Sequence, residues 1–247
     1  MKKEDKEVIY NLLKKADGYV NGFTSGEFSK DVKFEEEIAV SSTAMTEVST
    51  TMTQDTETAT GLTLDQLNSK ILRCTKCQLA RTRNNVVPGE GVENPEVLVI
   101  GEGPGYDEDM SGRPFVGKAG VLLDKMLAAI GLDRKKNCYI ANVVKCRPPN
   151  NRDPEQTEEA ACFGFLQAQI HILKPKMILC MGRIAGHKML DCQTPLNQLR
   201  GQFFEYNGIP LMVTYHPSAL LRDQGLKAPA WQDLKAFRKK LDEITKA

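Results

Sequence analysis

The sequence is short of long apolar runs and of histidine, and each shortage limits what the chain can be. No apolar run approaches the roughly 18 residues that a membrane-spanning helix needs, and the N-terminus carries no apolar core of the kind found in secretory signals. We therefore expect a cytoplasmic protein that does not enter a membrane. Three histidines in 247 residues leave few candidates for imidazole chemistry.

The seven cysteines are an odd number, which does not suit a framework of disulfides. In a reducing compartment, thiols stay free or bind metals. Cys138 and Cys180 lie in or beside apolar segments, and Cys192 follows an expected helix, so we interpret these three as core or surface thiols. The other four cysteines are candidates for a metal site.

Residues 1–60 differ from the rest of the chain in charge and composition. They carry a net charge of −5, whereas residues 61–247 carry +6. The Ser41–Thr60 stretch has no aromatic residue and no apolar periodicity, so we predict that it is disordered. The Lys3–Val20 stretch predicts either a short amphipathic helix that docks on a partner or a solvated, marginal helix. We expect a largely disordered extension over 1–60 and a folded domain over 61–247, whose basic balance suits a polyanionic partner.

Apolar runs that alternate with helical patterns predict the fold of residues 61–247. Buried strands are expected at Val97–Ile100, Tyr139–Val144 and Met177–Cys180, and the Asn207-Gly208 turn predicts a hairpin between Gln202–Tyr206 and Leu211–Tyr215. The expected helices cover Leu62–Leu72, Gly117–Ile130, Asp153–Leu173 with Asp153 as its N-cap, a segment from about Arg183, and Trp231–Ile244. Strands that alternate with helices favour a three-layer α/β/α domain with a mostly parallel central sheet.

A loop rich in glycine follows the first buried strand. The run Val97–Ile100 stops at Gly101–Gly105 (GEGPG), which carries one carboxylate, Glu102. Parallel sheets bind ligands at the carboxyl ends of their strands, so this loop is a candidate pocket loop. An ordinary turn between a strand and a helix is the alternative.

His216 is the histidine best placed for chemistry. It follows the expected strand that ends at Tyr215 and precedes Pro217, so its imidazole is presented at the carboxyl end of a strand. A buried, hydrogen-bonded core histidine is the alternative interpretation. His171 and His187 lie within expected helices, where a surface or capping role is favoured.

Four cysteines have the pattern of a metal site. Cys74 and Cys77 form a C-x2-C pair in a polar loop, Cys146 follows the second strand, and Cys162 lies in the next helix. Four thiolates from separate elements can bind either a tetrahedral zinc ion or an iron–sulfur cluster. The wide separation of Cys146 from Cys162 favours the cluster, and two buried structural thiols are the alternative.

Five motifs resemble those of the family 4 uracil-DNA glycosylases, over a region from about Leu62 to the C-terminus. The motifs are the GEGPG loop, Arg113–Gly117 (RPFVG), Asn142–Pro149 (NVVKCRPP), the four cysteines named above, and His216-Pro217-Ser218. The resemblance implies a uracil-DNA glycosylase-like fold with a [4Fe-4S] cluster bound by Cys74, Cys77, Cys146 and Cys162. It also implies a repair enzyme that hydrolyses the N-glycosidic bond of uracil flipped out of DNA, which leaves an abasic site.

The resemblance assigns residues to the uracil pocket. Phe115 matches the residue that stacks on the flipped base, and Asn142 matches the carboxamide that distinguishes uracil from cytosine. Gly103 lies in the substrate-binding loop, at the position where family 1 enzymes carry an aspartate. Gly105 replaces the tyrosine that excludes thymine in family 1, and we expect Glu108 to occupy that space, with Asp109 as the second candidate.

The resemblance also assigns the catalytic roles. His216 matches the donor that stabilises the negative charge developing on O2 of the departing uracil. Glu102 matches the residue that positions the attacking water or contacts the base. Both residues are therefore expected to act on the glycosidic bond.

DNA contacts are expected around the late histidine motif. Ser218 is expected to bind a phosphate, and Arg222, Lys118 and Arg147 to supply positive charge at the same rim. Leu220 is expected to fill the gap that the extruded nucleotide leaves, although packing under the loop is the alternative.

Two other functions are open at the level of sequence. One is a catalytically weak module that binds uracil-containing DNA. The other is an iron–sulfur or zinc interaction protein, for example one associated with a polymerase. In each case the N-terminal extension could dock on a replication or repair protein, and we expect the chain to be a monomer.

Overall fold

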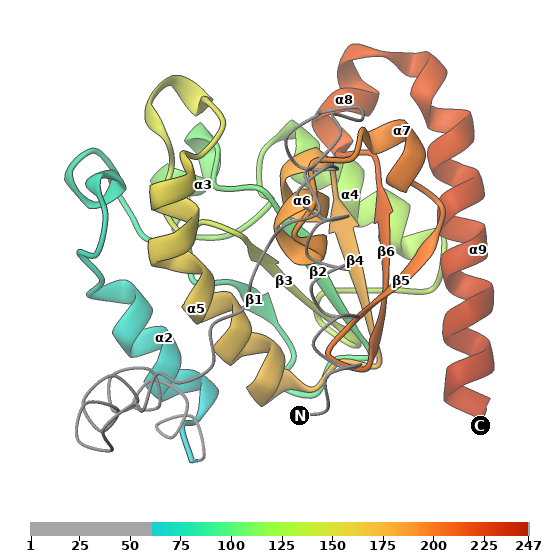
Figure 1. Cartoon of the computed structure of the whole chain (residues 1–247), viewed down its shortest axis with the longest axis horizontal. Helices are drawn as coiled ribbons and strands as arrows, with labels where there is room; N and C mark the ends of the chain where they lie inside the picture. The colour runs from blue at the N-terminus through green and yellow to red at the C-terminus, as the bar shows by residue number, and fades with distance from the viewer. Residues whose placement is uncertain (1–60, 247) are drawn as a thin grey trace, which may run out of the picture. The chain divides into compact units, whose positions relative to one another are not determined.

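The computed structural model describes residues 61–246, which form a six-stranded mixed sheet between two layers of helices (Figure 1). The strand order is β1-β3-β2-β4-β6-β5. The four central strands are parallel, and β1 and β5 pair antiparallel at the two edges. The strands are β1 (Glu90–Gly91), β2 (Val97–Gly101), β3 (Cys138–Asn142), β4 (Met177–Met181), β5 (Phe203–Tyr206) and β6 (Ile209–Thr214). The three strand runs, the hairpin and the mostly parallel sheet predicted from the sequence are confirmed.

Alternate residues of the buried strands face the two helical layers. Leu98 and Ile100 of β2 belong to one core cluster, whereas Val97 and Val99 belong to the other. The first cluster packs α2 (Leu64–Leu72), α5 (Gln156–Leu173) and α6 (Arg183–Leu190), and the second packs α4 (Lys118–Ala128), α8 (Pro217–Arg222) and α9 (Lys227–Lys246). The expected three-layer α/β/α architecture is therefore confirmed (Figure 1).

The long helix α5 begins later than the sequence predicts. It starts at Gln156 with Glu155 as its N-cap, so the prediction of Asp153 as N-cap is wrong. The backbone amide of Glu155 donates to the Glu158 carboxylate at 2.9 Å, which makes a local capping box. The Asp153 carboxylate instead pairs with Arg183 of α6 at 2.5 Å.

The structure also contains short helical segments that the sequence patterns do not predict, because these segments are too short to show a periodic apolar signal. They are α3 (Tyr106–Ser111), α7 (Leu196–Leu199) and 3-10 turns at Gln78–Arg81, Pro149–Asn151 and Gln224–Leu226. The helix α3 follows the GEGPG loop directly, so it shapes one wall of the pocket described below.

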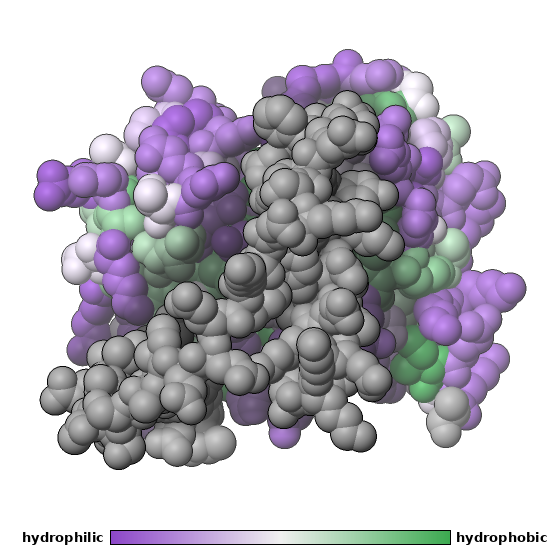
Figure 2. Space-filling model, in the orientation of Figure 1, coloured by the Kyte–Doolittle hydropathy of each residue, from purple (hydrophilic) through white to green (hydrophobic). Residues whose placement is uncertain are grey.

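The C-terminal helix α9 is tied to the sheet by a buried polar network. Asp233 is 3% exposed and accepts hydrogen bonds from Thr214 of β6 at 2.7 Å and from Arg200 at 2.6 Å. Hydrophilic side chains cover much of the visible outer surface along α9 (Figure 2), as expected for a helix whose apolar side packs on a sheet.

Among residues 61–246, no helix combines the length and apolar character required to cross a bilayer. The predicted disorder of Ser41–Thr60 and the helix predicted within Lys3–Val20 lie outside the described residues.

Candidate active site and cysteine cavity

A cavity of about 590 Å³ opens at the carboxyl ends of the central parallel strands. From β2 the chain moves to β3 on one side and then to β4 on the other, so the site lies where open α/β sheets bind ligands. The predicted pocket residues that line it are Glu102, Gly103, Glu108, Phe115, Asn142, His216, Ser218 and Arg222. The structure thus brings together side chains that are up to 120 positions apart in the sequence.

Asn142 presents a buried hydrogen-bond acceptor that the described part of the protein leaves without a donor. It is the last residue of β3 and is 2% exposed, and its Oδ1 atom accepts no hydrogen bond from residues 61–246. The absence of a side chain at Gly101 makes this arrangement possible, because a Cβ there would lie 2.4 Å from Oδ1. An unpaired buried acceptor costs about 1–3 kcal/mol, which a ligand N–H in the cavity would recover.

Phe115 is held in an unusual backbone conformation beside His216. Its φ angle is +52°, a region that side-chain-bearing residues rarely adopt, and the two ring centroids are 5.5 Å apart. Gly120 packs directly under this turn, because a Cβ there would lie 1.9 Å from the Phe115 carbonyl oxygen. The aromatic ring is therefore fixed at the wall of the cavity.

Arg134 anchors the Phe115 turn from outside the motif. Its guanidinium is 8% exposed and donates to the carbonyl oxygens of Pro114 at 2.9 Å and Phe115 at 3.0 Å. The same group binds Asp124 of α4 at 2.7 Å. Sequence reasoning missed Arg134, because it lies about 20 residues from the turn in a segment without a recognisable motif.

The Glu108 carboxylate joins the two halves of the pocket loop. It accepts backbone N–H bonds from Gly105 at 3.1 Å, Val116 at 2.9 Å and Gly117 at 3.1 Å. A Cβ at Gly105 would lie 2.8 Å from Glu108 Oε2, so this carboxylate occupies the space beside Gly105, as expected.

Asp109, the second candidate for that space, is placed elsewhere. It is 1% exposed, accepts hydrogen bonds from the backbone amides of Asn84 and Asn85, and does not line the cavity. The prediction that Asp109 could fill the space beside Gly105 is therefore wrong, since its carboxylate anchors the Asn84-Asn85 loop.

His216 is neutral, and its tautomer is determined by its neighbour. The backbone N–H of Ser218 donates to Nδ1 at 3.1 Å, so Nδ1 is an acceptor and the imidazole proton resides on Nε2. Burial, together with the positive charge of Arg222, lowers the pKa of His216 to about 4. At neutral pH the ring is thus an uncharged donor through Nε2–H.

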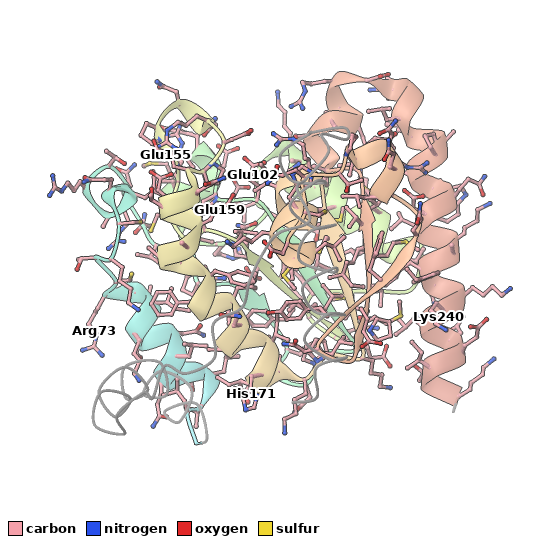
Figure 3. All side chains as sticks on the ribbon, viewed as in Figure 1. Arg73, Glu102, Glu155, Glu159, His171 and Lys240 are labelled. Atoms are coloured by element: carbon pink, nitrogen blue, oxygen red, sulfur yellow. The ribbon has the colours of Figure 1, made fainter. Side chains whose placement is uncertain are left out.

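Glu102 has a strongly shifted acidity. Burial, together with the negative charge of Asp153, raises the pKa of its carboxyl group to about 7. Figure 3 shows Glu102 near the first turns of α5, where Glu159 also contributes negative charge. A carboxylate with this pKa can take up a proton at physiological pH.

The rim of the cavity differs from the sequence prediction at one leucine. Leu220 is 2% exposed and packs in the core beneath α8, so its predicted contact with DNA is wrong. Leu221, one position further around the helix, is 42% exposed. The Ser218 hydroxyl lies 2.8 Å from His216 Nδ1, so a phosphate contact through its hydrogen would have to replace that bond.

Gly182 lines the cavity but was not predicted as a pocket residue, because a single glycine after a strand does not form a recognisable motif. It lies after β4 with φ of +91°, and a Cβ at this position would lie 2.9 Å from His216 Cβ. Both its conformation and this close approach favour glycine. Arg152, Asp153 and Arg183 also line the cavity and were likewise not predicted to do so.

The four candidate ligand cysteines converge on a second, smaller cavity that shares no lining residue with the first. Cys74 and Cys77 follow α2, Cys146 follows β3, and Cys162 lies in α5. No three histidine, cysteine, aspartate or glutamate side chains among residues 61–246 stand close enough together to bind a single metal ion. All seven cysteines of the chain are free thiols.

Three of these four sulfur atoms accept N–H bonds. The Arg83 guanidinium donates to Cys146 at 3.2 Å, the backbone amide of Lys145 donates to Cys162 at 3.3 Å, and the amide of Lys76 donates to Cys74 at 3.5 Å. Hydrogen bonds of this kind stabilise thiolates that bind iron–sulfur clusters. The donor chemistry of these four cysteines therefore suits the expected group, while no three of them stand within reach of one metal ion.

Comparison with known proteins agrees with this architecture. Residues 88–235 match the family model of the Uracil DNA glycosylase superfamily. The chain is 41% identical over 180 residues to a Type-4 uracil-DNA glycosylase of Archaeoglobus fulgidus, which covers 70% of this chain and 90% of the relative. It is 43% identical over 163 residues to a Type-4 uracil-DNA glycosylase of Thermotoga maritima, which covers 65% of this chain and 84% of that relative.

The matched region contains the pocket loop, the Asn142 strand end and the late histidine motif, so sequence similarity and geometry coincide at one cavity. The chain therefore belongs to the type-4 uracil-DNA glycosylases of the Uracil DNA glycosylase superfamily.

Proposed function

We propose that this protein is a DNA repair enzyme that hydrolyses the N-glycosidic bond of uracil flipped out of DNA and releases free uracil. The unpaired Oδ1 atom of Asn142 carries this proposal. Uracil presents an N3–H donor to such an acceptor, whereas N3 of cytosine is itself an acceptor and would leave Oδ1 unpaired. Sites built around such a bond discriminate strongly against the base that lacks it.

The orientation of His216 suits the departure of the base. As the C1′–N1 bond breaks, its electron pair leaves with uracil and negative charge gathers on O2. The Nε2–H of neutral His216 can donate to that oxygen, and the bond strengthens as the charge develops. Ser218 is a positioning residue in this scheme, because its amide determines which ring nitrogen carries the proton.

Glu102 completes the hydrolysis. We propose that Glu102 positions the attacking water. The water oxygen forms the new bond to C1′ while one proton of the water passes to the Glu102 carboxylate. The raised pKa of Glu102, caused by burial, makes it a stronger base than an exposed glutamate. Gly103, the next residue of the loop, packs closely against Val144, since a Cβ at that position would lie 2.7 Å from Val144 Cγ2.

The remaining pocket groups select the base. Phe115 offers an aromatic wall for stacking, which is worth about 1–3 kcal/mol per base. Glu108, fixed by three backbone amides, occupies the space beside Gly105 and would meet the methyl group of thymine.

Leu221 and Arg222 are our candidates for contact with DNA at the rim. Leu221 is exposed and can enter the space that the flipped nucleotide leaves, in place of the buried Leu220. Arg222 lines the cavity and can pair with a phosphate, as can Lys118 and Arg147 nearby. We propose no phosphate contact for Ser218, because its hydroxyl group is bonded to His216.

We further propose that Cys74, Cys77, Cys146 and Cys162 hold a [4Fe-4S] cluster. The three N–H bonds to their sulfur atoms support this assignment. When bound, the cluster would link α2, the end of β3 and α5, and would contribute folding free energy. A cytoplasmic location, a monomeric state and a docking role of residues 1–60 stay predictions.

Incubation of the protein with a single-stranded oligonucleotide that contains one uracil tests the function. We expect free uracil and an abasic strand, and a His216→Ala variant that folds normally but releases uracil at least about 100-fold more slowly, the size of effect that loss of one oxyanion donor produces. Tight binding of the oligonucleotide without product would instead support the catalytically weak binding module.

A further inference from the structure

An exposed aromatic side chain at the rim of the cavity has no role in the mechanism above. Tyr106 is the first residue of α3 and follows Gly105, which lines the cavity. Its side chain is 57% exposed, the largest exposure among the large hydrophobic residues in the described part of the chain.

One face of the Tyr106 ring is already occupied by a cation. The guanidinium carbon of Arg147 lies 5.1 Å from the ring centroid, within the range of a cation–π contact. Arg147 is itself fixed, because its Nε donates to Asn151 Oδ1 at 2.8 Å, and Asn151 lines the cavity. The ring is therefore held at the rim, with more than half of its surface open to a ligand.

The cavity has room for more than one pyrimidine. Its volume of about 590 Å³ is within the range that accommodates drug-sized ligands, which are larger than uracil. A nucleotide adjacent to the extruded uracil must therefore pass close to the rim. Exposed aromatic rings backed by arginine are the usual platforms on which unpaired bases stack.

We propose that Tyr106, supported by Arg147, is a stacking platform for an unpaired base next to the target uracil, and that it favours single-stranded DNA. This inference rests on the proposed function. In a duplex the neighbouring base is paired and stacked within the helix, so it cannot reach the ring. In a single strand the base is free to turn onto the tyrosine, and Arg147 adds attraction for the nearby phosphate.

The test compares Tyr106→Ala, Tyr106→Phe and the wild type on single-stranded and duplex oligonucleotides that contain one uracil. We expect Tyr106→Ala to lower kcat/KM on the single strand roughly 5- to 100-fold, and to change it less than about twofold on the duplex. Tyr106→Phe keeps the ring and should match the wild type. Trp231→Ala is the matched control, because Trp231 is 41% exposed on α9 and does not line the cavity.

Substrates with an abasic tetrahydrofuran on either side of the uracil locate the contact. Removal of the neighbouring base should slow uracil release by the wild type as much as the Tyr106→Ala substitution does. The same removal should not slow uracil release by the Tyr106→Ala variant any further. The proposal is overturned if Tyr106→Ala matches the wild type on single strands, or if its loss is the same with and without neighbouring bases.

Affinity for the same oligonucleotides, measured by fluorescence anisotropy, separates this proposal from the proposed function. If no protein releases uracil, the function is wrong, whereas weaker binding of single strands by Tyr106→Ala would still support the platform. Equal affinity of that variant and the wild type would contradict it.

Discussion

At the scale of single residues, the pocket depends on a few groups whose state is determined by their surroundings. Asn142 keeps an acceptor without a protein donor, and the Ser218 amide places the proton of His216 on Nε2. Burial shifts the pKa values of His216 and Glu102 in opposite directions, to about 4 and about 7. At pH 7.5 both groups are therefore mostly in the form that the proposed hydrolysis requires.

The pKa of Glu102 predicts how activity depends on pH. Because burial raises this pKa to about 7, the carboxylate is lost as the pH falls below 7, while His216 stays neutral down to about 4. We expect kcat/KM to fall about tenfold per pH unit below 7 and to be level above it. Measurement of kcat/KM between pH 5.5 and 8.5 checks this.

The Glu102→Gln variant is the control for that profile. It should be slower at every pH and should show no inflection near 7, because glutamine does not titrate. An inflection near 7 that persists in this variant would assign the ionisation to another group.

At the scale of elements, the strand runs were predictable and the contacts between elements were not. The continuous apolar composition of Val97–Ile100 and Met177–Cys180 predicts buried strands, because both faces of these strands are covered by helices. Arg134 could not be assigned, since its partners are the carbonyl groups of a distant turn. The resemblance assigns the wedge to Leu220, whereas Leu221 is the exposed leucine, because the rotational position of the short helix α8 is not evident from sequence.

The leucine pair gives a matched test of how α8 is oriented. Leu220→Ala should lower the free energy of unfolding by about 2–5 kcal/mol, because it leaves a cavity in the core. Leu221→Ala should change it by less than about 0.5 kcal/mol and should slow uracil release from duplex DNA. Denaturant unfolding and duplex kinetics of the two variants measure this, and the reverse pattern would show that Leu220 faces the DNA.

The Arg134 contacts predict an effect on the Phe115 turn. Arg134→Lys keeps the charge beside Asp124 but cannot bridge two carbonyl groups, so the strained turn should relax. We expect KM for uracil-containing DNA to rise roughly three- to tenfold, consistent with loss of part of the stacking free energy, with a smaller change in kcat.

A double-mutant cycle with Phe115→Ala distinguishes positioning from general destabilisation. If Arg134 acts through the ring, Arg134→Lys should add little to the KM of Phe115→Ala. Additive effects of the two substitutions would show that Arg134 only stabilises the fold.

At the scale of the whole molecule, the cysteine cavity and the active site are separate but adjacent in sequence. Asn142 ends β3, and Cys146 follows four residues later. Between them, Lys145 is fully buried and its Nζ donates to the carbonyl oxygen of Asn142 at 2.9 Å. The segment that presents Asn142, the side chain that we propose recognises the base, is therefore also the one that the proposed cluster would fix.

Cysteine substitutions test the proposed cluster. Cys146→Ser should reduce the iron and sulfide content and lower Tm, because a four-thiolate site cannot close with three ligands. Cys192 does not line that cavity, so Cys192→Ser should keep the iron and sulfide content and the Tm of the wild type. Elemental analysis and the visible absorption spectrum check this, and a colourless wild type that contains zinc would rule out the cluster.

The central claim is that the cavity recognises uracil through Asn142, and base release from matched single strands tests it most directly. The wild type is expected to release uracil and to leave cytosine at the same position intact. Asn142→Ala is expected to lose at least about 100-fold in kcat/KM for uracil while it keeps its fold. Release of uracil by this variant at the wild-type rate, or equal release of cytosine by the wild type, would contradict the account.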